Sequence, residues 1–140
     1  MTCFIYDPIG NEKEDEIYYK NADGCLIVYD ISDKKSFEEV KNNYIPLIKK
    51  NCKKDIEIIL LGNKSDLDYL RQVSVEEGTN LAFENKFRFK ETSCYDNKNV
   101  SDAFQTIIEM TNFQMKKIEK KKINAQFFKF ILFIFFRFIF

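Results

Sequence analysis

The stretch IEIILLGNKSD, residues 56–66, decides the fold. Its first six residues form an apolar run broken only by Glu57, and Gly62 ends the run, which predicts a β-strand over Ile56–Leu61. The polar residues Asn63–Asp66 follow this strand directly. Because open α/β sheets bind ligands at the carboxyl ends of their strands, the stretch predicts a strand that carries a ligand-binding loop at its end.

Strand and helix patterns alternate on both sides of this stretch. Asp33 or Ser36 can cap a first helix, Ser74 and Glu77 form a capping box for a second, and a last helix begins at Asn99. This alternation predicts an α/β fold, a parallel sheet with helices on both faces. The other predicted strands are Thr2–Tyr6, Gly24–Asp30, an apolar run typical of a strand covered on both faces, and Phe87–Glu91.

The predicted helices each carry an apolar side that is expected to face the sheet. Pro46 lies inside the first helix and is expected to kink it or end it early, and the second helix is expected to end near Asn85. The expected buried residues are Phe37, Val40, Tyr44 and Leu47 on the first helix, Val75, Leu81 and Ala82 on the second, and Val100, Ala103, Phe104, Ile107 and Ile108 on the last.

The composition excludes several classes of function. The chain has 22 basic and 22 acidic side chains, so its charge gives no general attraction to nucleic acid or to an acidic membrane. It has no histidine, which excludes histidine-based catalysis and histidine–metal sites. Its four cysteines form no CxxC pair, and the first 20 residues contain no apolar signal-peptide core, so we expect a reduced, cytosolic compartment.

The loop Asn63–Asp66 has side chains that suit a guanine base. The Asp66 carboxylate can accept two hydrogen bonds, from guanine N1–H and from the exocyclic amine, whereas adenine offers no such pair of donors. Asn63 can reach N7, and the stem of Lys64 can lie along the base plane. The alternative is a polar turn in which Asp66 caps the next segment.

A second loop adds to this pattern and brings a family resemblance. Glu91-Thr92-Ser93-Cys94 ends the strand Phe87–Glu91, and with these residues in view the chain resembles the Rab proteins of the Ras superfamily. The resemblance covers residues 4–112. It rests on YYKNADG (residues 18–24), VYDI (28–31), SFEEV (36–40), LGNKSDL (61–67) and the segments 74–82 and 89–93.

This resemblance implies a P-loop NTPase-type (Ras-like) sheet and a site for GTP or GDP. Asn63 and Asp66 would bind the base, Lys64 would pack on it, and Ser93 with the backbone N–H of Cys94 would complete the guanine pocket. The family usually has Ala and Lys where this chain has Cys94 and Tyr95. A backbone contact tolerates Cys, and a tyrosine ring can stack on the base.

The resemblance also implies a phosphate side of the site. Asp7-Pro8-Ile9-Gly10 resembles the family's D-x-x-G, in which the Asp holds Mg²⁺ through water and the Gly amide contacts the γ-phosphate. Asn11 stands where the family has Gln. Its amide is one methylene shorter, so we expect it to orient an attacking water poorly. The alternative is a bare turn with no phosphate contact.

Several phosphate-binding parts have no counterpart in the sequence. It contains no G-x-x-x-x-G-K-[ST] motif, so we expect an N-terminally truncated domain that lacks the first strand, the P-loop and the first switch. Such a chain is not expected to hydrolyse GTP alone. In the family the missing strand lies between those predicted at Thr2–Tyr6 and Gly24–Asp30. Either the sheet re-pairs across this gap or two edges are exposed, and both predict low stability or aggregation.

The last 25 residues differ in composition from the rest. We expect a partial GTPase domain over residues 1–115, and a basic linker with an apolar tail over 116–140. Five lysines lie within 116–122, and 127–140 is apolar except for Lys129 and Arg137. The tail has no cysteine for prenylation and is short for a bilayer span. It can be read as an anchor at a membrane interface or as translated noncoding sequence.

The sequence thus predicts a Rab-like GTP-binding switch of vesicle traffic. The resemblance implies exchange factors and effectors as partners, with no nucleic acid, and a cytoplasmic protein that can be peripheral at the cytoplasmic face of membranes. One alternative is a non-catalytic pseudo-GTPase that acts as a binding module. A third is a membrane-surface peptide carrier that acts through its tail.

Overall fold

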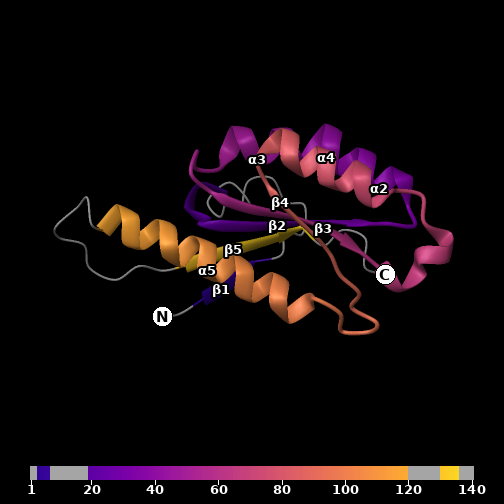
Figure 1. Ribbon diagram of the computed structural model, residues 1–140. Coiled ribbons are helices and arrows are strands. Elements are labelled where there is room, and N and C mark those ends of the chain that lie inside the picture. The colour runs from indigo at the N-terminus through magenta and orange to yellow at the C-terminus, as the bar shows by residue number, and fades with distance from the viewer. Residues whose placement is uncertain (1–2, 7–18, 120–129, 136–140) are drawn as a thin grey trace.

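Apolar runs of the sequence pair into one parallel sheet (Figure 1). The computed structural model describes residues 3–6, 19–119 and 130–135. The described strands pair in the order β1-β5-β2-β3-β4, and every pair is parallel, so the predicted α/β class is confirmed. Thr2, predicted as the start of the first strand, lies outside the described residues. The strands are β1 (Cys3–Tyr6), β2 (Gly24–Asp30), β3 (Glu57–Asn63), β4 (Arg88–Glu91) and β5 (Phe130–Phe135).

Helices cover both faces of the sheet. On one face lie α2 (Lys34–Glu39), the π-helical turn η1 (Val40–Tyr44), α3 (Ile45–Asn51) and α4 (Val75–Asn85), and on the other lies α5 (Val100–Glu119) (Figure 1). The 3₁₀ helix η2 (Ser65–Leu70) follows β3. None of the helices in the described ranges is both long enough and apolar enough to cross a membrane.

The predicted helix caps are present in the structure. Of the two candidates for the first helix, Asp33 is the cap, because its side chain accepts a hydrogen bond from the Lys35 backbone N–H at 2.9 Å. At the start of α4, the Glu77 N–H donates to Ser74 Oγ at 3.1 Å and the Ser74 N–H donates to Glu77 Oε2 at 2.9 Å. This reciprocal pair is the predicted capping box, and α4 ends at Asn85 as predicted.

The helical segment continues through Pro46, but it contains the π-helical turn η1 just before this residue. It lies in the first turn of α3, directly after η1, where a missing N–H costs little. The wider π-turn shifts the buried side of the next turn, so Ile45 and Ile48 are buried. Leu47, predicted to be buried, is 37% exposed. The prediction for Val75 is also wrong, because the first residue of α4 lies at the rim and is 49% exposed.

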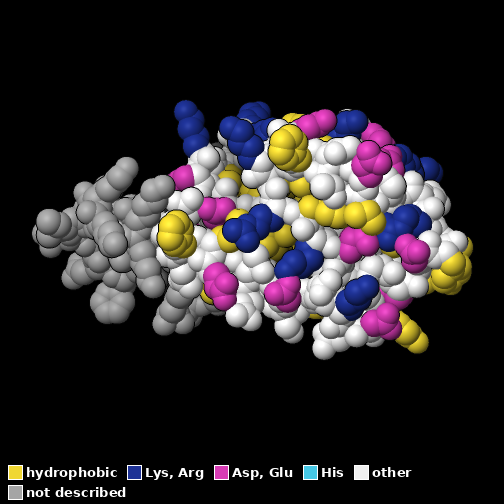
Figure 2. All heavy atoms as spheres, in the orientation of Figure 1, with side chains coloured by type: hydrophobic (Ala, Val, Ile, Leu, Met, Phe, Trp, Pro, Cys, Tyr) yellow, Lys and Arg dark blue, Asp and Glu magenta, His cyan; other side chains and the backbone are white. Residues whose placement is uncertain are grey.

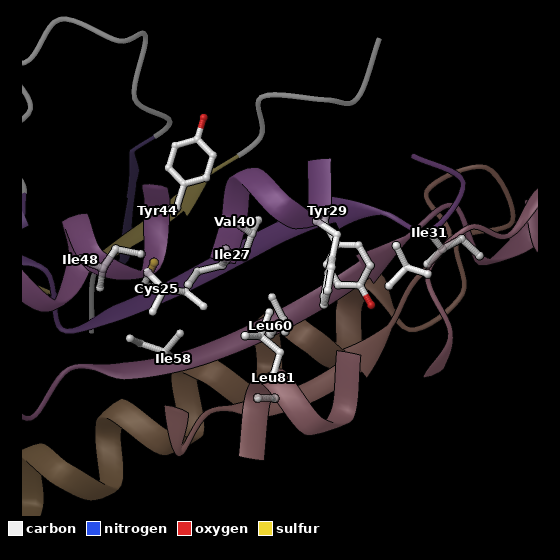
Figure 3. Close-up of a cluster of buried hydrophobic side chains, with 14 of the residues drawn as sticks. Cys25, Ile27, Tyr29, Ile31, Val40, Tyr44, Ile48, Ile58, Leu60 and Leu81 are labelled. Atoms are coloured by element: carbon white, nitrogen blue, oxygen red, sulfur yellow. The ribbon is translucent and has the colours of Figure 1, made fainter. Parts of the chain in front are cut away.

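The core is split between the two faces of the sheet by the alternation of side chains along β2 and β3. Cys25, Ile27 and Tyr29 of β2 join the cluster beneath α2, α3 and α4, which also contains Ile58 and Leu60 of β3 (Figure 3). The intervening residues of both strands pack against α5, in a cluster formed by Leu26, Val28, Ile59, Leu61, Ala103 and Ile107. Both strands are therefore buried on both sides.

Gly24 allows α5 to lie close to the sheet. A Cβ atom at this position would lie 2.9 Å from Ile107 Cγ1 and 3.0 Å from Thr111 Cγ2. Since real Cβ contacts of this length are essentially absent from proteins, any larger residue would push α5 outward. The direction of α5 is also defined, because Gln114 donates to Glu57 at the start of β3, at 2.8 Å. The helix thus ends near the amino ends of the strands.

The gap predicted beside the second strand is filled by β5. This segment lies between β1 and β2, so the sheet re-pairs through residues that were predicted to form an apolar tail. Helix α5 continues through residues 115 and 116 to Glu119. The two facing edges expected at β1 and β2 are therefore paired in this structure.

Tyr29 has a buried hydroxyl with no hydrogen-bond partner among the described residues. Its ring packs edge-on against Phe37, with centroids 4.9 Å apart. Burial raises the pKa of the Tyr29 hydroxyl well above its ordinary value, so the group stays neutral. Its Oη atom lies where a Cβ on Gly78 would be only 2.5 Å away, which shows how closely α4 packs there.

The Tyr29→Phe substitution is expected to raise the free energy of unfolding by about 1 kcal/mol, because it removes a buried polar atom that makes no hydrogen bond. Urea unfolding measures this as a higher midpoint with an unchanged slope. Tyr69→Phe is the matched control, since that side chain is 79% exposed and its hydroxyl is in water. A lower midpoint for Tyr29→Phe alone would show that the hydroxyl is hydrogen-bonded in solution.

Candidate functional site

The candidate site lies where β3 and β4 end side by side. The two strands pair in parallel, with Gly62 opposite Glu91, so the residues that follow each strand meet at one edge of the sheet. Two backbone hydrogen bonds join them: the Thr92 N–H donates to the Gly62 carbonyl at 2.9 Å, and the Ser65 N–H donates to the Thr92 carbonyl at 3.0 Å. The sheet itself therefore sets the distance between the two predicted guanine loops.

Asp66 and Ser93 meet across these loops. Ser93 is fully buried, and its Oγ donates to Asp66 Oδ1 at 2.5 Å. The same Oγ accepts a hydrogen bond from the Asp96 backbone N–H at 3.0 Å. The hydroxyl thus has a fixed orientation and holds the carboxylate in one position, while no hydrogen bond from the described residues reaches Asp66 Oδ2.

Asn63 is held by Thr92, the residue before Ser93 in the second loop. Its side chain is buried, and its Oδ1 accepts a hydrogen bond from Thr92 Oγ1 at 3.1 Å. This contact uses the carbonyl end of the amide, so the NH₂ end is left to donate. Asn63, Asp66 and Ser93, which were predicted from two separate stretches of sequence, are therefore brought together by the fold.

Lys64 makes a contact that was not predicted. Its backbone is left-handed, with φ 62°, and its Nζ forms an ion pair with Asp30 Oδ2 at 2.9 Å. Asp30 ends β2 and also accepts hydrogen bonds from the Ser32 N–H at 2.8 Å and the Ser32 hydroxyl at 2.6 Å. The sequence places Asp30 at the end of one apolar strand and Lys64 just after the next. Because these two strands, β2 and β3, are neighbours in the sheet, this placement could have indicated the ion pair.

The charge of Asp30 is stabilised by these partners. Burial by itself would raise the pKa of this carboxyl, but the hydrogen bonds from Ser32 and from the Lys64 ammonium outweigh it, and the pKa lies below its ordinary value. The carboxylate is therefore ionised at neutral pH and keeps Lys64 in place. Both ends of the lysine are fixed, the backbone by its conformation and the ammonium by Asp30.

Cys94 and Tyr95 lie at the rim of the site. Both are exposed, and the Tyr95 side chain is 89% accessible, so its ring is available to a ligand. They begin a loop that closes through reciprocal hydrogen bonds between the backbones of Ser93 and Lys98, at 3.0 and 2.9 Å. Asn97 and Asn99 in this loop have positive φ angles of 53° and 58°, a conformation that asparagine tolerates well.

An apolar pocket adjoins the site on the α5 side of the sheet. It extends from the buried residues of β2 and β3 to the first turns of α5, and Asn63 and Cys94 of the two loops are among its lining residues. It is lined by Leu26, Val28, Leu61, Asn63, Thr92, Cys94, Val100, Ala103 and Phe104. The site therefore combines fixed polar groups on the loops with an apolar hollow beside them.

Arg71 supports the end of β4 and was also missed. It donates to both carboxylate oxygens of Glu91, at 2.6 and 3.0 Å, and to the Val73 carbonyl at 3.0 Å. Such a two-pronged arginine–carboxylate pair fixes orientation as well as distance. Asn99 adds a hydrogen bond to the Glu91 carbonyl at 2.8 Å. The residue just before the Thr92–Ser93 loop is therefore held by two neighbouring segments.

The predicted phosphate residues Asp7, Gly10 and Asn11 lie outside the described residues. Within the described ranges, no group of three or more His, Cys, Asp or Glu side chains could hold a metal ion. The guanine half of the predicted site thus has a described geometry, whereas the phosphate and Mg²⁺ half stays a prediction.

The chain matches one family model and several curated proteins. Residues 2–113 match the model of the Ras family. The chain is 41% identical over 106 residues to Ras-related protein Rab-13 of Rattus norvegicus, covering 74% of this chain and 52% of that protein. It is 43% identical over 107 residues to GTP-binding protein ypt3 of Schizosaccharomyces pombe, covering 74% and 50%. It is 40% identical over 119 residues to Ras-related protein Rab-8A of Bos taurus, covering 82% and 57%. The chain spans about half the length of the curated relatives it matches.

Proposed function

This chain belongs to the Ras family, among its Rab-type small GTPases, and on that premise we propose that it binds guanine nucleotide at the ends of β3 and β4. The observation that carries the proposal is the 2.5 Å hydrogen bond from Ser93 Oγ to Asp66 Oδ1, which joins the two loops. This hydrogen bond orients the Asp66 carboxylate at the position that we propose for the base.

Asp66 is proposed to select guanine. Guanine presents N1–H and an exocyclic amine as neighbouring donors, and a carboxylate oriented by Ser93 can accept both hydrogen bonds. Adenine has an acceptor at N1, so the carboxylate would lose its partners, and an unpaired charged group in a partly buried site is costly. Selectivity then follows from the penalty on adenine as well as from the bonds to guanine.

Asn63 and Lys64 are proposed to complete the contacts to the base. The amide NH₂ of Asn63 can donate to N7, since its carbonyl end is already bonded to Thr92. The Lys64 ammonium is paired with Asp30, so the lysine stem can offer an apolar surface to the base plane. The exposed ring of Tyr95 can stack on the base, and the Cys94 N–H can contact its carbonyl.

The phosphate side is proposed from the sequence alone. Asp7 would hold Mg²⁺ through water, the Gly10 amide would contact the γ-phosphate, and Asn11 would stand where an attacking water is oriented. When bound, Mg²⁺ neutralises charge on the phosphates. Asn11 is one methylene shorter than the family's Gln, so slow hydrolysis is expected even where all other phosphate contacts are present.

The biological role proposed is that of a switch in vesicle traffic, with exchange factors and effectors as partners, at the cytoplasmic face of membranes. The Rab-type relatives support this role. On the face drawn in Figure 2, Lys and Arg side chains are interspersed with Asp and Glu. Among the described residues on that face, side chains of the two charge signs are mixed, so this part of the surface favours no partner of a single charge sign.

A non-catalytic binding module is a second candidate, favoured by one observation. The sequence contains no G-x-x-x-x-G-K-[ST], the motif whose amides, lysine and hydroxyl hold the phosphates and Mg²⁺. In this case the guanine loops would serve a protein that recognises the base and does not turn over GTP.

Titration of the 140-residue chain with fluorescent GDP, GTP and ATP tests the proposal. Binding is expected to be weaker than nanomolar and selective for guanine, because the base is recognised and the phosphates have few partners. Equal affinity for ATP would contradict the assignment of the guanine loops. GTP turnover is expected at the uncatalysed background. Mg²⁺-dependent turnover above it would overturn the non-catalytic alternative.

A further inference from the structure

A slot for one strand lies between β1 and β2. Within the described part of the sheet these two strands do not pair with each other, and each is bonded instead to β5. On one side Cys3 is opposite Phe130 and Tyr6 opposite Phe133. On the other side Leu132–Phe135 is opposite Gly24–Ile27. The strand in the slot is thus internal, with hydrogen-bonded neighbours on both sides.

The path of the chain allows its own C-terminal segment to reach this slot. Val100, at the start of α5, shares the apolar pocket with Asn63 at the end of β3, whereas Gln114 bonds to Glu57 at the start of β3. The helix therefore runs opposite to the strands and ends near their amino ends. A parallel strand must begin at that end, and the ten residues 120–129 separate Glu119 from Phe130.

The sequence of the segment suits this position. FILFIF, residues 130–135, contains no polar side chain, as is typical of a parallel strand covered on both faces. Charged residues bound the apolar run at Lys129 and Arg137, which limits a buried strand to about the length that β5 has. The neighbouring residues of β2 are fully buried, with 0% exposure at Cys25, Leu26 and Ile27.

We propose that the slot between β1 and β2 is a strand-binding site for an extended apolar peptide, and that its occupant is the chain's own segment Phe130–Phe135. The segment is then a structural strand of the folded protein, and a lipid surface does not hold it. If the segment were bound to a membrane instead, the backbone N–H and C=O groups of β1 and β2 that face the slot would have no partners. Unpaired backbone groups are costly in buried strands.

The register provides a direct test in the full-length chain. Cys3 is opposite Phe130, so Phe130→Cys places a second thiol beside a natural one. Neighbouring strands lie about 5 Å apart, within the range of Cα separations that a disulfide spans. Ile131→Cys is the matched control, because adjacent residues of a strand point to opposite faces and position 131 is opposite Phe4.

After mild oxidation with glutathione disulfide, peptide mapping of the monomer is expected to show at least about tenfold more linkage of Cys3 to position 130 than to position 131. Equal linkage in the two variants, or none in either, would overturn the proposal. The Cys3-to-130 linkage found only between two chains would also overturn it, since the occupant would then be a second copy. Loss of linkage on adding phosphatidylserine vesicles would show that a membrane removes the strand and would contradict it as well.

A second pair keeps the test decisive if Phe130→Cys does not fold. Phe133→Cys is opposite Cys25 on β2, and Leu132→Cys, opposite Gly24, is its control. Burial raises the pKa of the Cys25 thiol, so this linkage is expected to form more slowly and is followed over longer oxidation. The same preference for the register-matched position supports the proposal, and its absence contradicts it. Nucleotide binding need not be measured, so a failure here is separate from a failure of the proposed function.

Discussion

The Phe133→Pro substitution is expected to lower the free energy of unfolding by about 3 kcal/mol or more, which would leave much of the chain unfolded. Phe133 is in the middle of β5 and is paired with both Tyr6 and Cys25. Proline has no N–H to donate and does not fit inside an internal strand. Loss of β5 would separate β1 from the sheet and expose the edge of β2. Circular dichroism with urea unfolding measures the change.

Phe133→Leu is the control for this prediction. It keeps an apolar side chain and the backbone N–H, so a much smaller loss of stability is expected from it than from proline. If proline at position 133 leaves the urea midpoint unchanged, the segment does not pair with β1 and β2 in solution.

The Asp66→Asn substitution is expected to remove most of the preference for guanine over adenine. An amide in this position presents a donor to the guanine amine, and each lost hydrogen bond to a charged group is worth about 1.5–3 kcal/mol, or roughly ten- to a hundredfold in affinity. Competition of GDP and ADP against a fluorescent guanine nucleotide measures the preference.

Asp68→Asn is the matched control for charge. It lies two residues further along η2 and pairs with Arg71 at 2.7 Å, away from the proposed base contacts. Its GDP affinity is expected to stay close to that of the parent. If Asp66→Asn binds GDP as well as the parent does, Asp66 only links η2 to Ser93 and the proposed guanine site is wrong.

The strands of the core were predictable because each carries its own signal. Gly24–Asp30 is a continuous apolar run, and a run of this kind has few alternatives other than a strand buried on both faces. That Asn63, Asp66 and Ser93 lie close together was predictable for a different reason, since parallel strands end at one edge and these residues lie at or just after the ends of β3 and β4. What the pattern could not provide was the set of contacts between them, such as the bond from Ser93 to Asp66.

Other features depend on contacts between distant residues, which no local pattern reveals. An apolar run such as 130–135 fits a membrane interface, a tail or a strand equally well, and only pairing with β1 and β2 distinguishes them. Leu47 was misplaced because a π-turn shifted the helical period just before it. The ion pair of Lys64 with Asp30 joins the residue after β3 to the last residue of β2, and it follows from the neighbouring positions of these strands.

The position of β5 also has a consequence for synthesis of the chain. The ribosome makes β5 after β1 and β2, and about 120 residues after β1, yet β5 is the neighbour of both strands in the sheet. Contacts between such distant residues give a high contact order, so we expect slow folding. While the chain is being translated, β2 has been made but its neighbour on one side has not, and its open apolar edge can pair with other chains. Chaperones that cover this edge until β5 is made would therefore be expected to raise the yield of soluble protein.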